Sequence, residues 1–378
     1  MEYSKKNRKS ERKFHDTILD DLRRVDIRSS IGRDFRDMKR FYIDQERKRS
    51  LESMGRVRKF FWMVGFGFKS LYLKLNPARR ILLLFAIFFF FMGVQGSAKF
   101  YESGDSKVNI RLHTQQLLPT LSFLTILFIL MLELKDKLIA RNELEAGRRV
   151  QTKLMPESNP KIEGWEVWLY TRPAHEVGGD MIDYMKLAPG KYYLAQGDVA
   201  GKGLGAALLM VKLQATLRAM APDFHDPAAL GEKMNDVFHR DTPPSEFASM
   251  VYLEIDENGS QVSVLNAGHM PPICIKNGIM SPLPGGNPAL GLVHGVKFHT
   301  TGFSMNAGDI MVIYSDGLTE ACNEYGDFFG EERLLGLIEK VKSRQANIIG
   351  EYIIETARRF TGDESSHDDL SLIVLRKE

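Results

Sequence analysis

Four turns in the C-terminal part of this 378-residue chain hold the aspartates that could do chemistry. They are Glu176-Val-Gly-Gly-Asp180, Gly197-Asp198-Val-Ala-Gly-Lys-Gly203, Tyr314-Ser-Asp316-Gly317 and His367-Asp368-Asp369. Three follow a β-like apolar run or touch a glycine, and the last opens such a run. Carboxylates placed at strand ends can converge, and converging carboxylates need cations to neutralise one another. Oxygen-only ligands suit Mg²⁺ or Mn²⁺ rather than zinc, so we expect a hard-metal catalytic centre that acts on phosphate.

Each aspartate taken alone is more simply explained as a turn or cap residue. Four of them, at comparable places along successive strands, are less easily explained as separate turns. Residues 197–203 are not a P-loop, because the spacing is short and Gly203 stands where Ser or Thr must bind Mg²⁺. Met181-Ile182 likewise replaces the acidic-aromatic continuation that diguanylate-type cyclases have after Gly-Gly-Asp. The sequence shows no Ser/His/Asp triad with a nucleophile elbow.

Short β-rich runs, turns and a few helical stretches must position these turns. The predicted strands are 165–170, 192–196, 247–255, 262–265, 273–275, 310–314 and 370–375. The predicted helices are 204–220, 226–239, 331–341 and 346–360. Strands dominate without regular strand–helix–strand alternation, so we expect an antiparallel α+β domain rather than a doubly wound one.

Five motifs in order resemble the SpoIIE/RsbU-type serine phosphatases, which are bacterial relatives of the metal-dependent PPM (type two C) Ser/Thr phosphatases. They are Pro173-Ala-His-Glu-Val-Gly-Gly-Asp180, Gly197-Asp-Val-Ala-Gly-Lys-Gly203, Asn266-Ala-Gly-His-Met-Pro-Pro272, Tyr314-Ser-Asp-Gly-Leu-Thr-Glu320 and Asp368-Asp369-Leu-Ser371. The resemblance covers about residues 151–378, beginning at Gln151-x-x-Leu-x-Pro156. The motifs differ from the most common residues of the family at His175, Ala200 and Ser371. None of these differences removes a carboxylate.

This resemblance implies an αββα sandwich of two antiparallel sheets flanked by helices, with two Mn²⁺ or Mg²⁺ ions at one end of the sheets. Asp198 would bridge the two metals, with the Val199 carbonyl as a further ligand. Asp180 would hold one metal, and Asp316 and Asp368 the other, with Asp369 as the second choice within its pair. A two-metal clamp binds phosphate and lowers the pKa of water, which then attacks phosphorus without a covalent enzyme intermediate.

Further motif residues are expected around this centre. Asn266 and His269 would shape a turn beside the site, with direct acid catalysis by His269 as the alternative. Glu176, Asp183 and Lys202 would support the ligands or play purely structural roles, and Arg172 would meet the phosphoprotein.

The resemblance implies a phosphoserine/phosphothreonine protein phosphatase whose substrate is a small STAS-type anti-anti-sigma regulator. The competing hypothesis is a non-catalytic membrane signalling scaffold that uses a phosphatase-like domain to bind partners. A third idea is that the acidic site hydrolyses nucleotides.

Two apolar stretches that precede this domain predict a membrane anchor. The chain is 26% charged and 44% hydrophobic, as in ordinary globular proteins. Residues 81–98 and 112–132 are free of Asp, Glu, Lys and Arg, and both reach the roughly 17–25 residues that cross a bilayer. Neither stretch shows a polar face, so two transmembrane helices are favoured over two buried core helices. The two cysteines, Cys274 and Cys322, stand in no metal spacing and fit a reducing compartment.

Charge sets the orientation of this hairpin. Residues 1–80 carry 23 Lys and Arg against 11 Asp and Glu, whereas the loop 99–111 carries only Lys99, Lys107 and Arg111 as basic residues. Basic residues also follow the second span. The positive-inside rule therefore puts both termini and the catalytic domain, residues 157–378, in the cytoplasm, in a multi-pass protein of the cell (inner) membrane.

Two segments flank the spans. The basic N-terminal arm, residues 1–80, either attracts anionic lipids or is a solvated tail, and no nucleic acid partner is expected because no groove-reading or stacking motif accompanies its charge. Residues 133–156 form a linker helix that Pro156 ends. Ile139, Ala146, Val150 and Leu154 share one of its faces. That face would pair residues 133–154 of two copies in a homodimer, or pack on the helix's own domain.

Overall fold

The computed structural model describes residues 69, 72–98, 108–243, 245–284, 286–362 and 368–378. The chain divides into two compact units, residues 1–135 and 136–378. Residues 1–68 and 70–71 of the predicted basic arm, residues 99–107 of the predicted outer loop, and His367 lie outside the described residues.

Two long helices contain the predicted membrane spans: α5 (Pro77–Ala98) and α6 (Val108–Leu154). Helix α5 begins four residues before the predicted first span, at Pro77, a residue type favoured in the first turn of helices. Helix α6 begins at Val108, so residues 108–111, which were assigned to the loop, are helical. The predicted second span and the predicted linker helix are one continuous helix of 47 residues.

Helices α5 and α6 contact each other within the first unit, and three of these contacts involve Ala86, Arg79 and Gly93. The Ser122 hydroxyl donates to the Ala86 carbonyl at 2.7 Å, and Arg79 pairs with Glu133 at 2.5 Å. At Gly93 the ring of Pro119 occupies the space that a Cβ would need. Small residues let the two backbones approach closely, as is usual where helices meet in membranes.

Three helical segments among the described residues are long and apolar enough to cross a membrane, by length and composition alone: Pro77–Val94, Leu117–Leu154 and Leu204–Asp223. The first two belong to the predicted hairpin. The third includes α7 (Leu204–Met220), which buries Met210, Leu213 and Leu217 in the second unit. Its apolar composition is therefore explained by its contact with a sheet of that unit.

The second unit contains two five-stranded antiparallel sheets. The first sheet has the order β1-β10-β9-β6-β7 and the second β2-β3-β4-β5-β8. The strands of the first sheet are β1 (Trp165–Arg172), β10 (Leu370–Lys377), β9 (Ile310–Tyr314), β6 (Ile273–Lys276) and β7 (Ile279–Pro282). The strands of the second sheet are β2 (Met181–Ala188), β3 (Lys191–Val199), β4 (Ala248–Asp256), β5 (Gln261–Ala267) and β8 (Thr301–Ser304).

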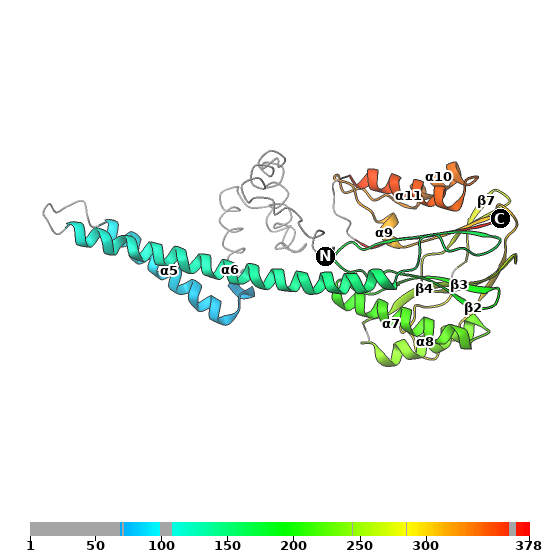
Figure 1. The fold of residues 1–378 in the computed structure, drawn as a ribbon, viewed down its shortest axis with the longest axis horizontal. Helices are drawn as coiled ribbons and strands as arrows, with labels where there is room; N and C mark the ends of the chain where they lie inside the picture. The colour runs from blue at the N-terminus through cyan, green and yellow to red at the C-terminus, as the bar shows by residue number, and fades with distance from the viewer. Residues whose placement is uncertain (1–68, 70–71, 99–107, 244, 285, 363–367) are drawn as a thin grey trace, which may run out of the picture. The chain divides into compact units, whose positions relative to one another are not determined.

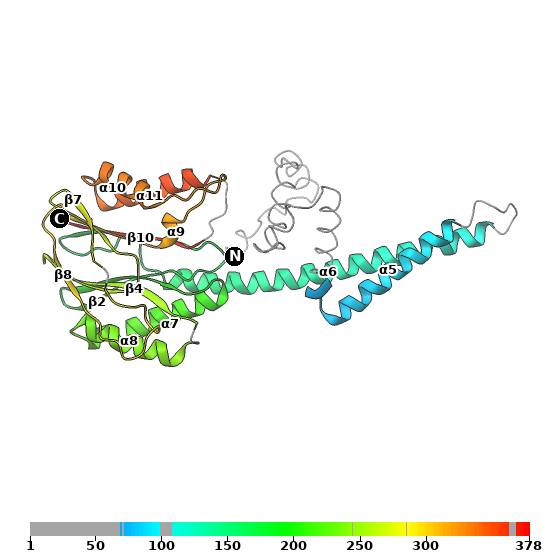
Figure 2. The ribbon, with the colours of Figure 1, turned by 180° about the vertical axis from the view of Figure 1, so that it is seen from behind.

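Helices cover the outer face of each sheet (Figure 1). Helices α10 (Glu331–Val341) and α11 (Ala346–Thr361) lie over the first sheet, and α7 and α8 (Pro227–Asp241) lie over the second, as the opposite view also shows (Figure 2). Two short helices, η2 (Ala221–Asp223) and α9 (Asp316–Thr319), complete the unit. The predicted αββα sandwich of two antiparallel sheets is confirmed.

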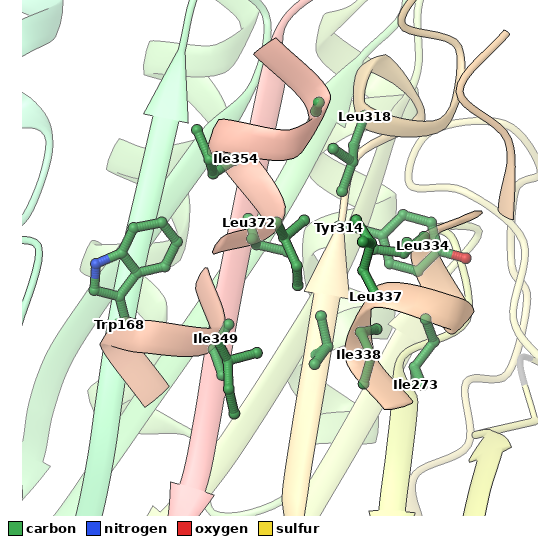
Figure 3. Close-up of a cluster of buried hydrophobic side chains, with 14 of the residues drawn as sticks. Trp168, Ile273, Tyr314, Leu318, Leu334, Leu337, Ile338, Ile349, Ile354 and Leu372 are labelled. Atoms are coloured by element: carbon green, nitrogen blue, oxygen red, sulfur yellow. The ribbon is translucent and has the colours of Figure 1, made fainter. Parts of the chain in front are cut away.

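Strand β9 shows why some runs are apolar throughout. Ile310, Val312 and Tyr314 belong to the cluster under α10 and α11, whereas Met311 and Ile313 belong to the cluster between the sheets. Figure 3 shows Tyr314 within the first of these clusters. Both faces of the strand are covered, so every position is buried. Helix α11 lies so close to the first sheet that a Cβ at Gly350 would overlap the Trp168 ring.

The structure contains each predicted strand and helix, with boundaries that differ by a few residues. Strands β2, β7 and β8 were not predicted. Strand β2 carries Asp183 and Lys186 among its apolar residues, which weakens the alternating pattern of a half-buried strand. Strands β7 and β8 are four-residue edge strands, too short to show a period.

Candidate metal centre

Strand register brings the aspartates together as two pairs, one from each sheet. Asp180 immediately precedes β2 and Asp198 is the penultimate residue of β3, and the register aligns Met181 with Gly197. Asp316 follows β9 and Asp368 precedes β10, where Tyr314 is opposite Leu372. In antiparallel neighbours the end of one strand lies beside the start of the next. Asp180 therefore lies at the start of β2 and next to the end of β3.

Three of these four aspartates meet at one cavity of about 360 Å³. Asp198, Val199, Asp316 and Asp368 line it, together with Lys202 and His269. Asp180 is buried and lies close enough to Asp198 for the two charges to interact. The structure thus brings the predicted bridging residue together with the ligands predicted for both metals.

Burial and the charges of neighbouring carboxylates raise the pKa values of three aspartates at this site. Burial, followed by the charges of Asp316, Asp368 and Asp369, raises the pKa of Asp198 to about 7. Burial and the charge of Asp198 raise the pKa of Asp180 well above its ordinary value, and burial and Asp368 raise that of Asp316. A cation bound among these carboxylates would remove the repulsion between them.

The available donors fit a hard divalent cation. The Asp180 Oδ2 atom is buried and has no hydrogen-bond partner among the described residues, an arrangement that is rare for a carboxylate unless an ion completes it. All the proposed ligand atoms are oxygens, as Mg²⁺ and Mn²⁺ prefer. In the described part of the chain, no three or more His, Cys, Asp or Glu side chains are already positioned to coordinate one metal ion. Lys202 Nζ lies 2.6 Å from Asp368 Oδ2, where it contributes positive charge to this cluster.

Asp369 differs from its neighbour Asp368 in what it contacts. Its Oδ1 accepts from the amide of Ala174 at 2.7 Å, and its Oδ2 accepts from the amides of Gly179 at 2.5 Å and Asp180 at 3.3 Å. A Cβ at Gly178 would lie 2.5 Å from Asp369 Oδ2, so this position requires glycine. Asp369 therefore anchors the loop that presents Asp180.

Gln151, near the end of α6, holds the same loop from the other side. Its Nε2 donates to the Gly178 carbonyl at 2.7 Å, and its Oε1 accepts from the Gly178 amide at 3.1 Å. The Gln151 side chain is buried. The sequence signal was the Gln151-x-x-Leu-x-Pro156 motif, to which no role was assigned.

Asn266 and His269 lie at a tight turn beside the cavity. Asn266 accepts from the His269 amide at 2.9 Å and donates to the His269 carbonyl at 3.1 Å. The His269 Nδ1 lies 2.8 Å from the hydroxyl of Ser249, a neighbour that the sequence did not identify. Burial lowers the pKa of His269 to about 4, so its ring is neutral near pH 7.

Three other predicted site residues lie apart from the Asp198 cavity. Asp183 is fully buried in an ion pair with Arg218 of α7, and Glu176 lies 4.0 Å from Arg141 of α6. Arg172 is exposed and lines a second cavity that also includes Asp180. These contacts give Asp183 a structural environment rather than a place beside the metal ligands.

The sandwich and its carboxylate-lined end define the class of metal-dependent type two C phosphatase domains. Residues 188–378 match the family described as Stage II sporulation protein E (SpoIIE). The chain belongs to this SpoIIE family.

Curated relatives and solved structures agree with this assignment. The chain is similar to Protein IcfG of Synechocystis sp., with 26% identity over 273 residues, and to Phosphoserine phosphatase RsbU of Bacillus subtilis, with 27% identity over 240 residues. These matches cover 64% and 63% of this chain, but 42% of IcfG and 71% of RsbU.

Two solved structures share the fold. One is the SiaA-PP2C domain of Pseudomonas aeruginosa, with a TM-score of 0.56 and 17% identity, covering 65% of this chain and 99% of that one. The other contains the RsbU and RsbW domains of a Mycobacterium tuberculosis protein, with a TM-score of 0.53 and 24% identity, covering 60% and 63%.

Proposed function

We propose that the protein is a membrane-anchored phosphatase that hydrolyses phosphoserine or phosphothreonine in a cytoplasmic protein. The observation that carries this proposal is the convergence of Asp198, Asp316 and Asp368 on one cavity, with Asp180 buried beside it. Membership of the SpoIIE family and similarity to a phosphoserine phosphatase support the same activity.

The residues at this centre would have different roles in binding the metal ions and in positioning the ligands. Asp198 would bind both of two Mn²⁺ or Mg²⁺ ions, with the Val199 carbonyl as a further ligand. Asp180 would bind one ion, and Asp316 and Asp368 the other. Bound ions of this kind activate water and neutralise charge on a phosphoryl group. Asp369 and Gln151 would keep Asp180 in place, because both bond to the loop that carries it. His269 would enter the reaction as a neutral ring.

The substrate that we propose is a phosphorylated regulator of the STAS-type anti-anti-sigma class. Similarity to RsbU supports a regulatory protein substrate. Helices α5 and α6 would anchor the chain in the cell membrane with both termini in the cytoplasm, and the basic arm would attract anionic lipids. Residues 133–154 would pair in a homodimer.

The test uses the full chain in lipid nanodiscs. With Mn²⁺ added, we expect hydrolysis of a phosphoserine peptide, and we expect Asp198→Asn to lower kcat by at least a hundredfold because the bridging carboxylate is lost. Asp236→Asn is the matched control, since Asp236 is exposed on α8 and lies outside the cavity. If the parent protein hydrolyses no phosphoester with Mn²⁺ or Mg²⁺, the phosphatase proposal fails and the scaffold hypothesis takes its place. Faster turnover of nucleotides than of phosphopeptides would instead support nucleotide hydrolysis.

A further inference from the structure

A second cavity, of about 510 Å³, adjoins the candidate metal centre on the side of Asp180. Asp180 and Asp369 contribute to its wall, whereas Asp198, Asp316 and Asp368 line the first cavity. Its volume falls within the range of about 300–1,000 Å³ that is usual for ligand sites. It is therefore large enough for side chains of a substrate that reaches the metal centre.

Three arginines from three separate elements line this second cavity: Arg148 of α6, Arg172 at the end of β1 and Arg358 of α11. All three are exposed. Across the described residues, the Arg148 and Arg172 guanidinium groups form no ion pair or hydrogen bond, unlike those of Arg218 and Arg376, which bond to carboxylates of the fold. Their positive charge is thus available to a ligand.

Arg358 is oriented without being neutralised. Its Nη2 donates to the Tyr170 hydroxyl at 2.7 Å, and its guanidinium lies 5.7 Å from the centroid of the Tyr170 ring. Stacking on an aromatic ring limits the motion of a guanidinium and leaves donors free for a carboxylate. Tyr170 in turn stacks on the buried Trp168 ring at 5.7 Å, which fixes its position on the sheet.

We propose that this cavity binds acidic side chains next to the phosphorylated residue of the protein substrate. The inference rests on the proposed function and specifies its substrate class. A phosphoryl group would go to the metal centre, and neighbouring Asp or Glu side chains would meet the guanidinium groups of Arg148, Arg172 and Arg358. Guanidinium forks bind carboxylates through paired hydrogen bonds. The carboxylates of Asp180 and Asp369 would repel an acidic side chain that went deeper, so its place is beside the arginines.

The test compares two phosphoserine peptides that differ only in having Asp and Glu, or Asn and Gln, beside the phosphoserine. Full-length protein in nanodiscs with Mn²⁺ should show a higher kcat/KM for the acidic peptide. In a triple variant, Arg148→Gln with Arg172→Gln and Arg358→Gln, that preference should fall about eightfold, since an exposed ion pair contributes roughly a factor of two. The loss should appear in KM.

Arg149→Gln and Arg359→Gln are matched controls, because both arginines are exposed neighbours that do not line the cavity. They should retain the preference. The proposal is overturned if the triple variant retains the preference, or if it loses activity equally toward both peptides. A folding defect is excluded if the triple variant has the same Tm as the parent protein. If its Tm is lower, the peptide comparison is repeated with the three single variants.

A binding measurement in EDTA tests whether the second cavity binds acidic side chains independently of whether the protein is a phosphatase. Fluorescence anisotropy of the labelled acidic peptide should give a Kd about eightfold higher for the triple variant even if the parent hydrolyses nothing. Arginine-dependent binding of inorganic phosphate alone, with no preference for the acidic peptide, would overturn the proposal in favour of a phosphoryl site.

Discussion

Arg218 of α7 neutralises Asp183, a carboxylate that is completely buried. Arg218 Nη2 donates to Asp183 Oδ1 at 2.6 Å, and Arg218 Nε donates to Asp183 Oδ2 at 2.8 Å. The Tyr193 hydroxyl donates to the same carboxylate at 2.8 Å, and burial and the Asp183 charge both raise the pKa of Tyr193, so this hydroxyl remains protonated. We predict that Arg218→Met destabilises the domain strongly.

The magnitude follows from the burial of the pair. Breaking a buried pair costs about 3–5 kcal/mol, because the remaining charge is uncompensated. The Arg218 side chain is 38% exposed and Tyr193 still donates, so we expect about 3 kcal/mol. For a unit of this size each kcal/mol lowers the Tm by about 2–4 °C, which gives a fall of about 6–12 °C. Asp183→Asn combined with Arg218→Met should recover part of this loss, since no buried charge remains.

The assay is thermal unfolding of the full chain in nanodiscs, in the presence of EDTA and with intrinsic fluorescence as the signal. Arg240→Met is the matched control, because Arg240 pairs with Asp241 at an exposed site where an ion pair contributes little. The reasoning is refuted if Arg218→Met melts within about 1 °C of the parent, or if the double variant melts below the single one. Unchanged Mn²⁺ affinity of the folded Arg218→Met variant would show that Asp183 is structural.

Two further predictions concern the surroundings of the metal centre. Gln151→Leu removes both hydrogen bonds to Gly178, so the loop that carries Asp180 loses a restraint; we expect Mn²⁺ affinity to fall about tenfold in calorimetric titration, and equal affinity in parent and variant would contradict this role. The neutral His269 should make stability depend on pH. The pKa of His269 is about 4 in the fold and about 6.5 when unfolded, so the unfolded chain binds more protons between these values. The stabilisation is complete above about pH 6.5 and is lost as pH falls toward 4, with an upper limit of about 3 kcal/mol. Urea unfolding in EDTA should show a weaker pH dependence in His269→Gln, and identical curves would exclude this residue as the cause.

Much of the fold could be predicted because its signals are local. Pro227 and the Asp226 cap mark the start of α8, since Asp226 accepts from the Ala228 amide at 3.0 Å. Strands β9 and β10 are recognisable in the sequence as apolar runs, because helices and a second sheet cover both their faces. Strand β2 gave no such signal, because Asp183 belongs to a buried polar network that forms only when Arg218 of α7 packs against it.

The sequence by itself determined the chemistry available to this protein: carboxylates beside glycine-containing turns, an oxygen-only donor set, and two apolar stretches long enough for a membrane. These properties reside in residue types and spacing. Only the tertiary structure decided which carboxylates meet and what each one contacts. Asp368 and Asp369 are adjacent in sequence, yet Asp368 lines the Asp198 cavity and Asp369 accepts from the amides of Ala174, Gly179 and Asp180. The physical reason is that successive side chains of an extended chain point in opposite directions, and the amides that Asp369 contacts come from a segment 189 to 195 residues away in the sequence.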